Sequence, residues 1–433
     1  MKARSQINVA LLGLGVVGSG VARALLEGAD RYSQHLGLSL VLRRVLVRDL
    51  DKPRALELNS ALLTTDPEAV LGDDSVDIFV EVMGGERPAY DYIVRALSRG
   101  RYVVTANKMV MANHGPQLLS LAQERGADIL YEASVGGGIP IISTLKRDLS
   151  ANRISSVVAI INGTTNYILS RMSHDDIDFA TALRQAQDLG YAEPDPTMDV
   201  EGHDAAYKLA ILTSLAFHAR VPPQDIPREG ITRLSARDFR YAHELGYAIK
   251  LLAVARLDQD SIQVRVHPAL LSEEEQLAKV DGALNAIQVE GDLLGPILLQ
   301  GAGAGSLPTA SAIVADIMEA ARRIAGGTHP SPGQYTADVP IKPLADLVTR
   351  YYIRMEVADR PGALAQIAGC FGDNNVSMAS VIQKETNEAA QTAEIVIMTH
   401  RAREADVQAA IQQVQSLDVV SEFGNFLRVQ DRT

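Results

Sequence analysis

Apolar and polar positions follow two periods along the first 135 residues. Four short apolar runs are typical of buried strands, at 7–12, 38–47, 77–82 and 102–105. Apolar residues recur at helical spacing in three further stretches, at 16–26, 90–98 and 116–125. Strands that alternate with helices in this way predict an α/β domain over residues 1–135, built on a doubly wound parallel sheet.

The pattern changes character over residues 136–300. Strands are expected at 154–162, 247–257, 261–267 and 285–290, together with strong helices such as 201–217. This mixture predicts an α+β domain with a largely antiparallel sheet. A long helix at 309–323, opened by the Gly-rich run 301–305, is expected to bring residues 301–325 back to the first domain.

Residues 326–349 are rich in Gly, Pro and polar side chains and are expected to form a linker. A compact pattern follows over 350–430. Its elements are strands at 351–357, 376–383, 392–399 and 419–429 and helices at 363–371 and 402–414. The order βαββαβ predicts a ferredoxin-like domain.

Length and composition narrow the class of protein. A chain of 433 residues suggests about three domains. The net charge of −12 argues against nucleic acid as a partner, and no run reaches the roughly 20 apolar residues of a membrane helix. Cys370 is the single cysteine, which excludes an intrachain disulfide and a multi-thiolate metal site. We therefore expect a cytoplasmic protein.

The run Gly13-Leu14-Gly15-Val16-Val17-Gly18 comes after the first strand and opens a helix. In that context the glycines allow a tight turn and close approach to a pyrophosphate, which the helix N-terminus attracts. The segment therefore predicts dinucleotide binding and a Rossmann-like first domain. A glycine-rich turn without a ligand is the alternative.

The end of the second strand bears on cofactor choice. Arg48 could accept a 2′-phosphate, which favours NADP, whereas an acidic residue there would bind the ribose 2′-hydroxyl of NAD. Asp49 is adjacent, so the two signals are mixed. Arg48 could also be a solvated strand end without a ligand.

Polar residues follow the fourth strand, from Thr105 to Lys108. Ligands of open α/β sheets bind at the carboxyl ends of the strands. Lys108 is therefore a candidate ligand of cofactor and substrate. A surface lysine that begins a loop is the alternative, and the residues alone leave both open.

The segment 190–200 is dense in acids and prolines and precedes the helix expected at 201–217. On that helix Asp204 and Lys208 are one turn apart, on a stripe that continues with apolar residues. An exposed ion pair is the simple interpretation. The apolar stripe favours partial desolvation, which makes a lysine a usable proton donor near neutral pH. Glu193 is a free acid that could bind a substrate ammonium group.

Two loops could bind ligands or serve structure alone. Glu132 to Pro140 offers a carboxylate and backbone oxygens, which suit a hard cation, but a glycine hinge is an equal alternative. Asn162 to Tyr167 offers hydroxyls and amides, which could be helix capping without a ligand. The nine histidines show no ligand spacing.

Taken together, these segments resemble homoserine dehydrogenase in its bacterial form with a C-terminal ACT domain. The segments are GLGVVG at 13–18, VEVMGG at 80–85, TANK at 105–108, EASVGGGIP at 132–140, NGTTNYIL at 162–169 and GYAEPDPTMDVEGHDAAYK at 190–208. The resemblance runs along nearly the whole chain, and the last two segments are highly specific in combination. Pro194, where Ala is common in the family, leaves the acids in place.

The resemblance implies reversible NAD(P)H-dependent reduction of L-aspartate 4-semialdehyde to L-homoserine, a step in threonine, methionine and isoleucine biosynthesis. By the same resemblance Lys208 is the proton donor and Lys108 its partner. Glu193, Asp199 and Asp204 are then the substrate-binding acids. The resemblance also implies that 136–300 binds substrate and forms dimers, and the chain is expected to be a dimer or tetramer.

The resemblance further implies a cofactor, NADP(H) or NAD(H), and a sodium ion. The cofactor contacts would be Gly13, Leu14, Gly15, Val16, Val17, Gly18, Arg48, Thr105, Lys108, Gly190 and Gly305. The sodium ligands would be Glu132, Val135, Gly137 and Ile139.

Two loops of the C-terminal domain resemble those with which paired ACT domains bind amino acids. The matching residues are Asp359, Gly362, Asn375 and Val376. In the family the usual ligand is threonine, an end product, which makes threonine the expected effector. A dimerisation module without a ligand is the alternative.

Two other functions compete with this interpretation. An acylating aldehyde dehydrogenase needs a nucleophilic cysteine, and the only thiol, Cys370, lies in the C-terminal domain. An NADP-sensing protein without turnover is the second rival. The pairing of Asp204 with Lys208 argues against that function.

Overall fold

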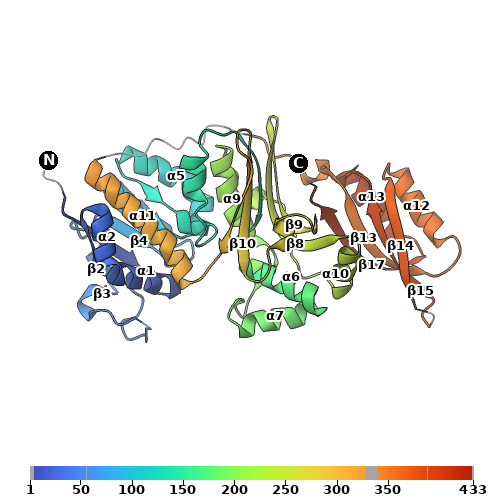
Figure 1. The fold of residues 1–433 in the computed structure, drawn as a ribbon, viewed down its shortest axis with the longest axis horizontal. Helices are drawn as coiled ribbons and strands as arrows, with labels where there is room; N and C mark the ends of the chain where they lie inside the picture. The colour runs from blue at the N-terminus through green and yellow to red at the C-terminus, as the bar shows by residue number, and fades with distance from the viewer. Residues whose placement is uncertain (1–3, 55, 328–338, 388, 432–433) are drawn as a thin grey trace. The chain divides into compact units, whose positions relative to one another are not determined.

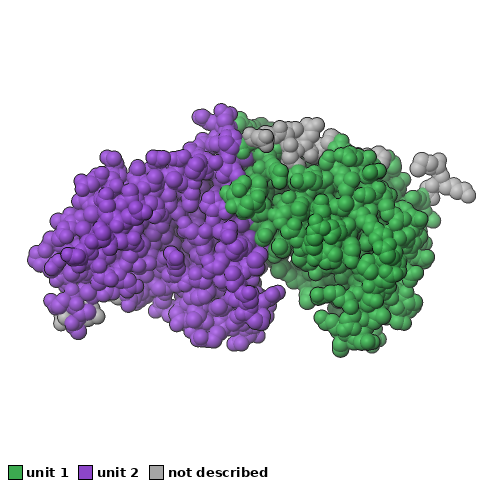
Figure 2. All heavy atoms as spheres, turned by 180° about the vertical axis from the view of Figure 1, so that it is seen from behind, with its two compact units in different colours: residues 1–157, 207–225, 285–339 green, residues 158–206, 226–284, 340–433 purple. Residues whose placement is uncertain are grey.

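The computed structural model describes residues 4–54, 56–327, 339–387 and 389–431. The chain divides into two compact units (Figure 2). Unit 1 comprises residues 1–157, 207–225 and 285–339, and unit 2 comprises 158–206, 226–284 and 340–433. The domain boundaries expected from the sequence stay a prediction, and residues 328–338 of the expected linker lie outside the described residues. Among the described helices, none combines the length with the hydropathy that a membrane-spanning segment requires.

Unit 1 contains the parallel sheet that the sequence predicts. The sheet has the order β3 (Leu63–Thr64), β2 (Ser39–Leu46), β1 (Gln6–Leu12), β4 (Ile78–Glu81), β5 (Tyr102–Thr105) and β6 (Ile129–Leu130). All neighbouring pairs are parallel. The doubly wound α/β fold is therefore confirmed, with β3 and β6 as two-residue strands that the pattern did not predict.

Six helices accompany this sheet in the described part of unit 1. They are α1 (Val16–Glu27), α2 (Ala29–Leu36), α3 (Pro67–Leu71), α4 (Ala89–Ser98), α5 (Lys108–Glu124) and α11 (Ser306–Gly326). Helix α11 runs beside α1 (Figure 1) and contributes Ala310, Ile313 and Ile317 to the same core as β1. The prediction that a helix begins at Pro116 is wrong, because α5 begins at Lys108 and Pro116 lies inside it.

The remaining strands of unit 1 include a hairpin that the sequence analysis missed in part. The prediction covered β10 (Leu284–Gly291) but not its neighbour β11 (Gly295–Ala302). Most side chains of β11 are half-buried or exposed, so it lacks the apolar run that marks a buried strand. Gly301 and Ala302 end β11 and do not open the helix, which begins at Ser306. Strand β7 (Ile154–Ile160) leads from unit 1 into unit 2.

Unit 2 carries helices around a β hairpin. The helices are α6 (Gly163–Asp175), α7 (Phe179–Asp188), α8 (Thr197–Val200) and α10 (Ala236–Glu244), and α9 (His203–Ala216) begins in this unit. The hairpin pairs β8 (Tyr247–Asp258) with β9 (Ser261–Ser272) in antiparallel register. The expected antiparallel pairing is confirmed for this hairpin, and the expected helices lie in the same unit.

The C-terminal part of unit 2 has the predicted βαββαβ order. Its elements are β13 (Tyr351–Ala358), α12 (Ala363–Asp373), β14 (Met378–Asn387), β15 (Thr392–Thr399), α13 (Glu404–Gln415) and β17 (Val420–Val429). Helices α12 and α13 cover one face of the sheet (Figure 1) and pack on Ile353 and Ile397, with Val407 of α13 in the same core. One detail is wrong: residues 402–403, expected to start a helix, form β16 and pair with β12 (Val348–Thr349).

The sheets of unit 2 are continuous, which the sequence analysis did not predict. Strand β17 pairs in parallel with β9, with Arg428 opposite Ala269 and Val429 opposite Leu270. The strands of unit 2 therefore follow the order β8-β9-β17-β13-β15-β14. The ferredoxin-like part and the β8–β9 hairpin share backbone hydrogen bonds as well as side-chain contacts.

A buried ion network reinforces this junction. Asp238 on α10 is fully buried and accepts a hydrogen bond from Arg354 Nε on β13 at 2.7 Å. Arg354 also donates to Glu394 on β15 at 2.8 Å, and Asn425 on β17 donates to Asp238 at 2.7 Å. Burial disfavours the charged guanidinium, but these carboxylates outweigh it and raise the pKa of Arg354.

Candidate active site

The glycine-rich loop of unit 1 lies between β1 and α1, at the carboxyl ends of the parallel strands. Gly13 has a φ of +108°, and a Cβ atom on Gly18 would lie 2.3 Å from the Gly13 carbonyl oxygen. Side chains would therefore prevent this turn. Gly15 is the N-cap of α1 and supplies no side-chain acceptor. The first amides of α1 are thus available for an anion.

A second helix begins beside this loop within unit 1. Gly305, with a φ of +119°, is the N-cap of α11 and also lacks a side-chain acceptor. The next residue, Ser306, donates from Oγ to the Val16 carbonyl at 2.8 Å. Two helix N-termini without side-chain caps therefore lie next to each other, an arrangement that fits the phosphates of a dinucleotide.

Arg48 is exposed just beyond the end of β2 and has no ion-pair partner in the described part of the chain. The neighbouring Asp49 is occupied locally, because its carboxylate accepts the amide of Asp51 at 2.9 Å. The guanidinium of Arg54 also hydrogen-bonds the Asp49 carbonyl. Of the two side chains that bear on cofactor choice, Arg48 therefore has fewer polar contacts than Asp49.

The polar residues after β5 belong to a connected buried set. Thr105 donates from Oγ1 to Glu81 at 2.6 Å and accepts the amide of Asn107 at 3.0 Å. Asn107 in turn caps α5 by accepting the amide of Val110 at 3.2 Å. Lys108 is thus the first residue of a helix, not the start of a loop, and its backbone is fixed at the carboxyl edge of the sheet.

Burial raises the pKa of Glu81, while its bond from Thr105 opposes that shift. Its second carboxylate oxygen accepts the amide of Met83 at 2.8 Å. Glu81 is fully buried at the end of β4. We therefore interpret it as a support for the strand ends.

The loop of residues 132–140 is packed rather than hinge-like. Gly136 and Gly137 have φ values of +73° and +57°. A Cβ atom on Gly137 would lie 2.5 Å from the Gly303 carbonyl oxygen. The amide of Gly138 donates to the Ala302 carbonyl at 3.1 Å. These contacts within unit 1 hold the loop in one conformation.

In this loop the backbone carbonyl oxygens suit a cation better than the carboxylate oxygens of Glu132 do. Both oxygens of the buried Glu132 carboxylate accept amides, from Ile142 and Ser143, at 2.7 Å. In the described residues the carbonyl oxygens of Val135 and Gly137 accept no hydrogen bond. Hard cations take carbonyl ligands of this kind. No cluster of three His, Cys, Asp or Glu residues occurs in the described ranges.

Asp316 on α11 lies against this loop. It accepts the Glu132 amide at 2.8 Å. Burial raises the pKa of Asp316 to about 7, although the bond from the Glu132 amide lowers it. Asp316 is therefore only partly ionised near neutral pH.

In unit 2 the structure brings together two of the predicted acids. Asp199 on α8 and Asp204 on α9 both accept hydrogen bonds from Asn162 Nδ2, at 2.6 and 2.9 Å. Asp204 is buried and Asp199 is half-buried. Lys208 follows Asp204 by one helical turn on α9 and is itself half-buried.

Glu193 and Gly190 lie in the exposed segment that connects α7 to α8. The Gln187 side chain donates to the Glu193 carbonyl at 3.1 Å. Thr164 at the start of α6 donates to the Tyr191 carbonyl at 2.6 Å. These contacts fix the backbone of the segment in unit 2, and the Glu193 side chain is exposed.

The predicted effector residues occupy two loops of the ferredoxin-like part. Asp359 and Gly362 precede α12, whereas Asn375 and Val376 follow it. The eleven residues of α12 span about 16 Å. The two loops therefore lie at opposite ends of one helix and do not form one small-molecule pocket within a single chain.

Sequence reasoning missed four residues that support the site. Glu81, Asn107 and Ser306 were not singled out, and Asn162 was considered only as a cap. Asn107 had a local signal, because Asn is a preferred N-cap residue. The others act through residues distant in the sequence, which no local pattern reveals.

Comparisons with known families agree with this arrangement. Residues 13–132 match the family described as "Homoserine dehydrogenase, NAD binding domain". Residues 140–318 match the family "Homoserine dehydrogenase" and residues 351–419 match the ACT domain. The three matches follow the chain in the order expected from its motifs.

Individual proteins give the same result. The chain is 44% identical to the homoserine dehydrogenase of Synechocystis over 98% of this chain and 99% of that protein. It is 42% identical, with a TM-score of 0.93, to the crystal structure of a homoserine dehydrogenase from Thiobacillus denitrificans, which covers all of both chains. A hyperthermophilic archaeal homoserine dehydrogenase in complex with NADPH covers 73% of this chain and 97% of its own, with 28% identity and a TM-score of 0.62.

Proposed function

The chain belongs to the homoserine dehydrogenase family, and from that premise we propose which of its residues carry the reaction. The activity is NAD(P)-dependent interconversion of L-aspartate 4-semialdehyde and L-homoserine. We propose that Lys208 is the proton donor, that Lys108 assists it, and that Glu193, Asp199 and Asp204 bind and orient the substrate. The joined carboxylates of Asp199 and Asp204, with Lys208 one turn further along α9, are the observation that supports this assignment most directly.

In the reduction, NAD(P)H supplies a hydride to the carbonyl carbon of the aldehyde. Negative charge develops on the carbonyl oxygen at the same time. The Lys208 ammonium stabilises that charge and transfers a proton to the oxygen, which becomes the hydroxyl of homoserine. The neutral amine then regains a proton from solvent. Asp204 keeps Lys208 in position.

The substrate carries an α-ammonium group, which needs anionic partners. Glu193 has an exposed side chain and Asp199 is half-buried, so both can meet a ligand. Carboxylates bind an ammonium group through charge-assisted hydrogen bonds. The direct test is NADPH oxidation with L-aspartate 4-semialdehyde by Glu193→Gln and Asp199→Asn, which should raise KM more than they lower kcat. An unchanged KM in both variants would contradict the assignment.

The glycine-rich loop and the N-terminus of α11 fit the phosphates of a dinucleotide, as the absence of side chains at Gly13, Gly15 and Gly305 indicates. We propose NADP(H) as the preferred cofactor, with Gly190 and Thr105 near the bound molecule. The support is that the Arg48 guanidinium has no ion-pair partner in the described residues, whereas the neighbouring Asp49 carboxylate already accepts a backbone amide.

Arg48→Ala is expected to weaken NADPH binding about 10- to 100-fold and to leave NADH binding unchanged, because only NADPH carries the 2′-phosphate. The measurement is the Kd of each cofactor by fluorescence titration. Asp49→Asn is the matched control, and it should leave both values unchanged. Equal losses for the two cofactors in Arg48→Ala would contradict the assignment.

We further propose that a sodium ion binds the loop of residues 132–140. The ligands would be backbone oxygens of Glu132, Val135, Gly137 and Ile139. The support is the pair of carbonyl oxygens at Val135 and Gly137 that accept no hydrogen bond in the described residues. The Glu132 carboxylate, held by two amides, would act through its charge.

Sodium chloride is expected to raise the Tm by about 2–4 °C over choline chloride at the same ionic strength, because an ion that binds only the folded chain stabilises it. Thermal unfolding measured without substrate provides the readout. Gly137→Ala should remove the sodium effect, since its Cβ would collide with Gly303. Equal Tm values for the wild-type protein in the two salts would contradict the site.

For the C-terminal ACT domain we propose threonine as the effector, bound by the Asp359–Gly362 loop of one copy and the Asn375–Val376 loop of another. The position of these loops at opposite ends of α12 supports a paired arrangement. A dimer or tetramer is therefore the proposed form of the protein. We propose the cytoplasm as its compartment, because its single cysteine fits a reducing environment. Calorimetric titration with threonine and with serine tests the choice of ligand, and heat from neither would contradict it.

A further inference from the structure

The side-chain amide of Asn162 joins two carboxylates from different segments of unit 2. Its Nδ2 donates to Asp199 Oδ1 at 2.6 Å and to Asp204 Oδ2 at 2.9 Å. An amide nitrogen carries two hydrogens, so these two bonds use both. Asn162 is 5% exposed and Asp204 is 2% exposed. Water therefore cannot easily replace the amide.

An amide suits this position because it is a donor without charge. Two carboxylates that share one donor nitrogen lie close together and repel each other. A lysine or arginine at 162 would overcome the repulsion but would also neutralise the acids. Asn162 supplies the hydrogen bonds and leaves the negative charge available for a cation.

We propose that Asn162 is a positioning residue for the reaction. It holds Asp199 and Asp204 in the orientation in which they meet the substrate ammonium group. This inference rests on the proposed function, in which Asp199 and Asp204 are the substrate-binding acids. It assigns to Asn162 a role beyond that of a helix cap.

The cap fixes which way the amide points. Asn162 Oδ1 accepts the amide of Thr165 at 2.8 Å, and also its hydroxyl at 3.0 Å, at the first turn of α6. Because the oxygen must accept these bonds, the nitrogen faces the two carboxylates. The N-terminus of α6 and the acid pair are thus linked through one side chain.

Helix α6 is itself anchored further along its length. Asn166 Nδ2 donates to the Val280 and Leu284 carbonyls at 3.0 and 3.1 Å. The hydroxyl of Ser170 accepts the amide of Gly282 at 3.0 Å. Buried Lys250 donates to the Val280 carbonyl at 2.7 Å, which also holds the segment 280–284 in place. Asn162, which orients the acids, is therefore the N-cap of a helix whose position is fixed by these contacts.

Two substitutions separate the role of Asn162 as a helix cap from its hydrogen bonds to the two carboxylates. Asn162→Ser keeps a good N-cap residue but is too short to reach both acids. Asn162→Asp also keeps the cap but places a third carboxylate where the donor was. We expect kcat/KM for homoserine to fall about 10-fold in Asn162→Ser and about 100-fold in Asn162→Asp. The Kd for NADPH should stay unchanged in both.

Thermal stability distinguishes positioning from a structural role. Asn162→Ser keeps the cap and adds no charge, so its Tm should stay close to the wild-type value while its kcat/KM falls. The third buried carboxylate of Asn162→Asp should lower the Tm as well as the activity. Asp178→Ala is the control, because Asp178 caps α7 in the same unit through the amide of Thr181 at 2.7 Å. It should lower the Tm and leave kcat/KM unchanged. Activity that follows Tm across the three variants would overturn the proposal.

Two further variants separate this proposal from the proposed function. If Asp199→Asn and Asp204→Asn keep wild-type kcat/KM, the assignment of the acids is wrong. If these two lose activity while Asn162→Ser and Asn162→Asp keep it, only the role of Asn162 is wrong. Loss in all four variants, in the order given above for Asn162, supports both.

Discussion

Asp238→Ala is expected to lower the free energy of unfolding by about 3–5 kcal/mol, the usual cost of removing one partner of a buried ion pair. Asp238 is fully buried and accepts hydrogen bonds from Arg354 and Asn425. Its removal leaves the Arg354 guanidinium buried with only Glu394 as an anionic partner. Denaturant unfolding followed by circular dichroism measures the loss.

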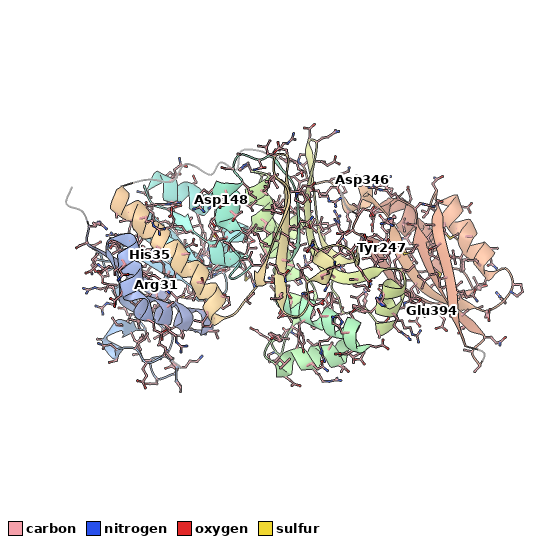
Figure 3. The ribbon with its side chains drawn as sticks, viewed as in Figure 1. Arg31, His35, Asp148, Tyr247, Asp346 and Glu394 are labelled. Carbon is pink, nitrogen blue, oxygen red and sulfur yellow. The ribbon has the colours of Figure 1, made fainter. Side chains whose placement is uncertain are left out.

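Two controls make this result specific. The double variant Asp238→Ala with Arg354→Met should recover part of the loss, because no unpaired charge then remains. Asp346→Ala breaks a surface pair with Arg403 in the same unit and should cause little change. Figure 3 labels Asp346, the half-buried acid of this control pair, and Glu394, the buried acid that remains beside Arg354 in Asp238→Ala. A wild-type unfolding midpoint for Asp238→Ala would contradict the importance of the network.

Lys208→Ala is expected to lower kcat by about 1000-fold or more in both directions of the reaction. General acid catalysis and stabilisation of the developing alkoxide are both lost with the ammonium group. The Kd for NADPH should stay at the wild-type value, because the glycine-rich loop and Arg48 remain. Initial rates of NADPH oxidation and a fluorescence titration measure the two quantities.

Lys208→Arg refines this prediction. A guanidinium keeps the positive charge but holds its proton far more tightly than an ammonium group. Its activity should therefore lie between those of the wild-type protein and Lys208→Ala. Lys342→Ala serves as the control lysine, since Lys342 pairs with Asp258 outside the proposed site. Full activity in Lys208→Ala would refute the assigned role.

The sequence predicted those parts of the fold that follow from local patterns. The strand, glycine loop and helix from Gln6 to Glu27 are all encoded by neighbouring residues, and the structure confirms them. The βαββαβ order from Tyr351 to Val429 is likewise confirmed. In both regions the apolar period changes clearly from strand to helix, so each element is marked by its own sequence.

Errors arose where local signals competed. Pro116 is favoured at helix starts, which led to a late start for α5. The structure shows that Asn107 caps the helix nine residues earlier and that Pro116 is tolerated inside it. Strand β11 was missed because its Gly and Pro residues and exposed positions hide the strand period.

Long-range pairing was beyond the reach of the sequence. The parallel pairing of β17 with β9 joins residues about 160 positions apart, such as Arg428 and Ala269. No periodicity reports which strand edges meet. The same holds for the bonds from Asn162 to Asp199 and Asp204, which lie 37 and 42 residues away. The acids were identified from their segment, whereas the residue that joins them required the fold.

The most direct test of the central claim is a single-turnover experiment. Protein preloaded with NADPH is mixed with L-aspartate 4-semialdehyde, and the loss of NADPH absorbance is followed in H2O and D2O. We predict that the wild-type rate is slower in D2O and that Lys208→Ala reacts about 1000-fold more slowly with the same bound NADPH. A Lys208→Ala rate equal to that of the wild-type protein would show that this ammonium group does not protonate the substrate.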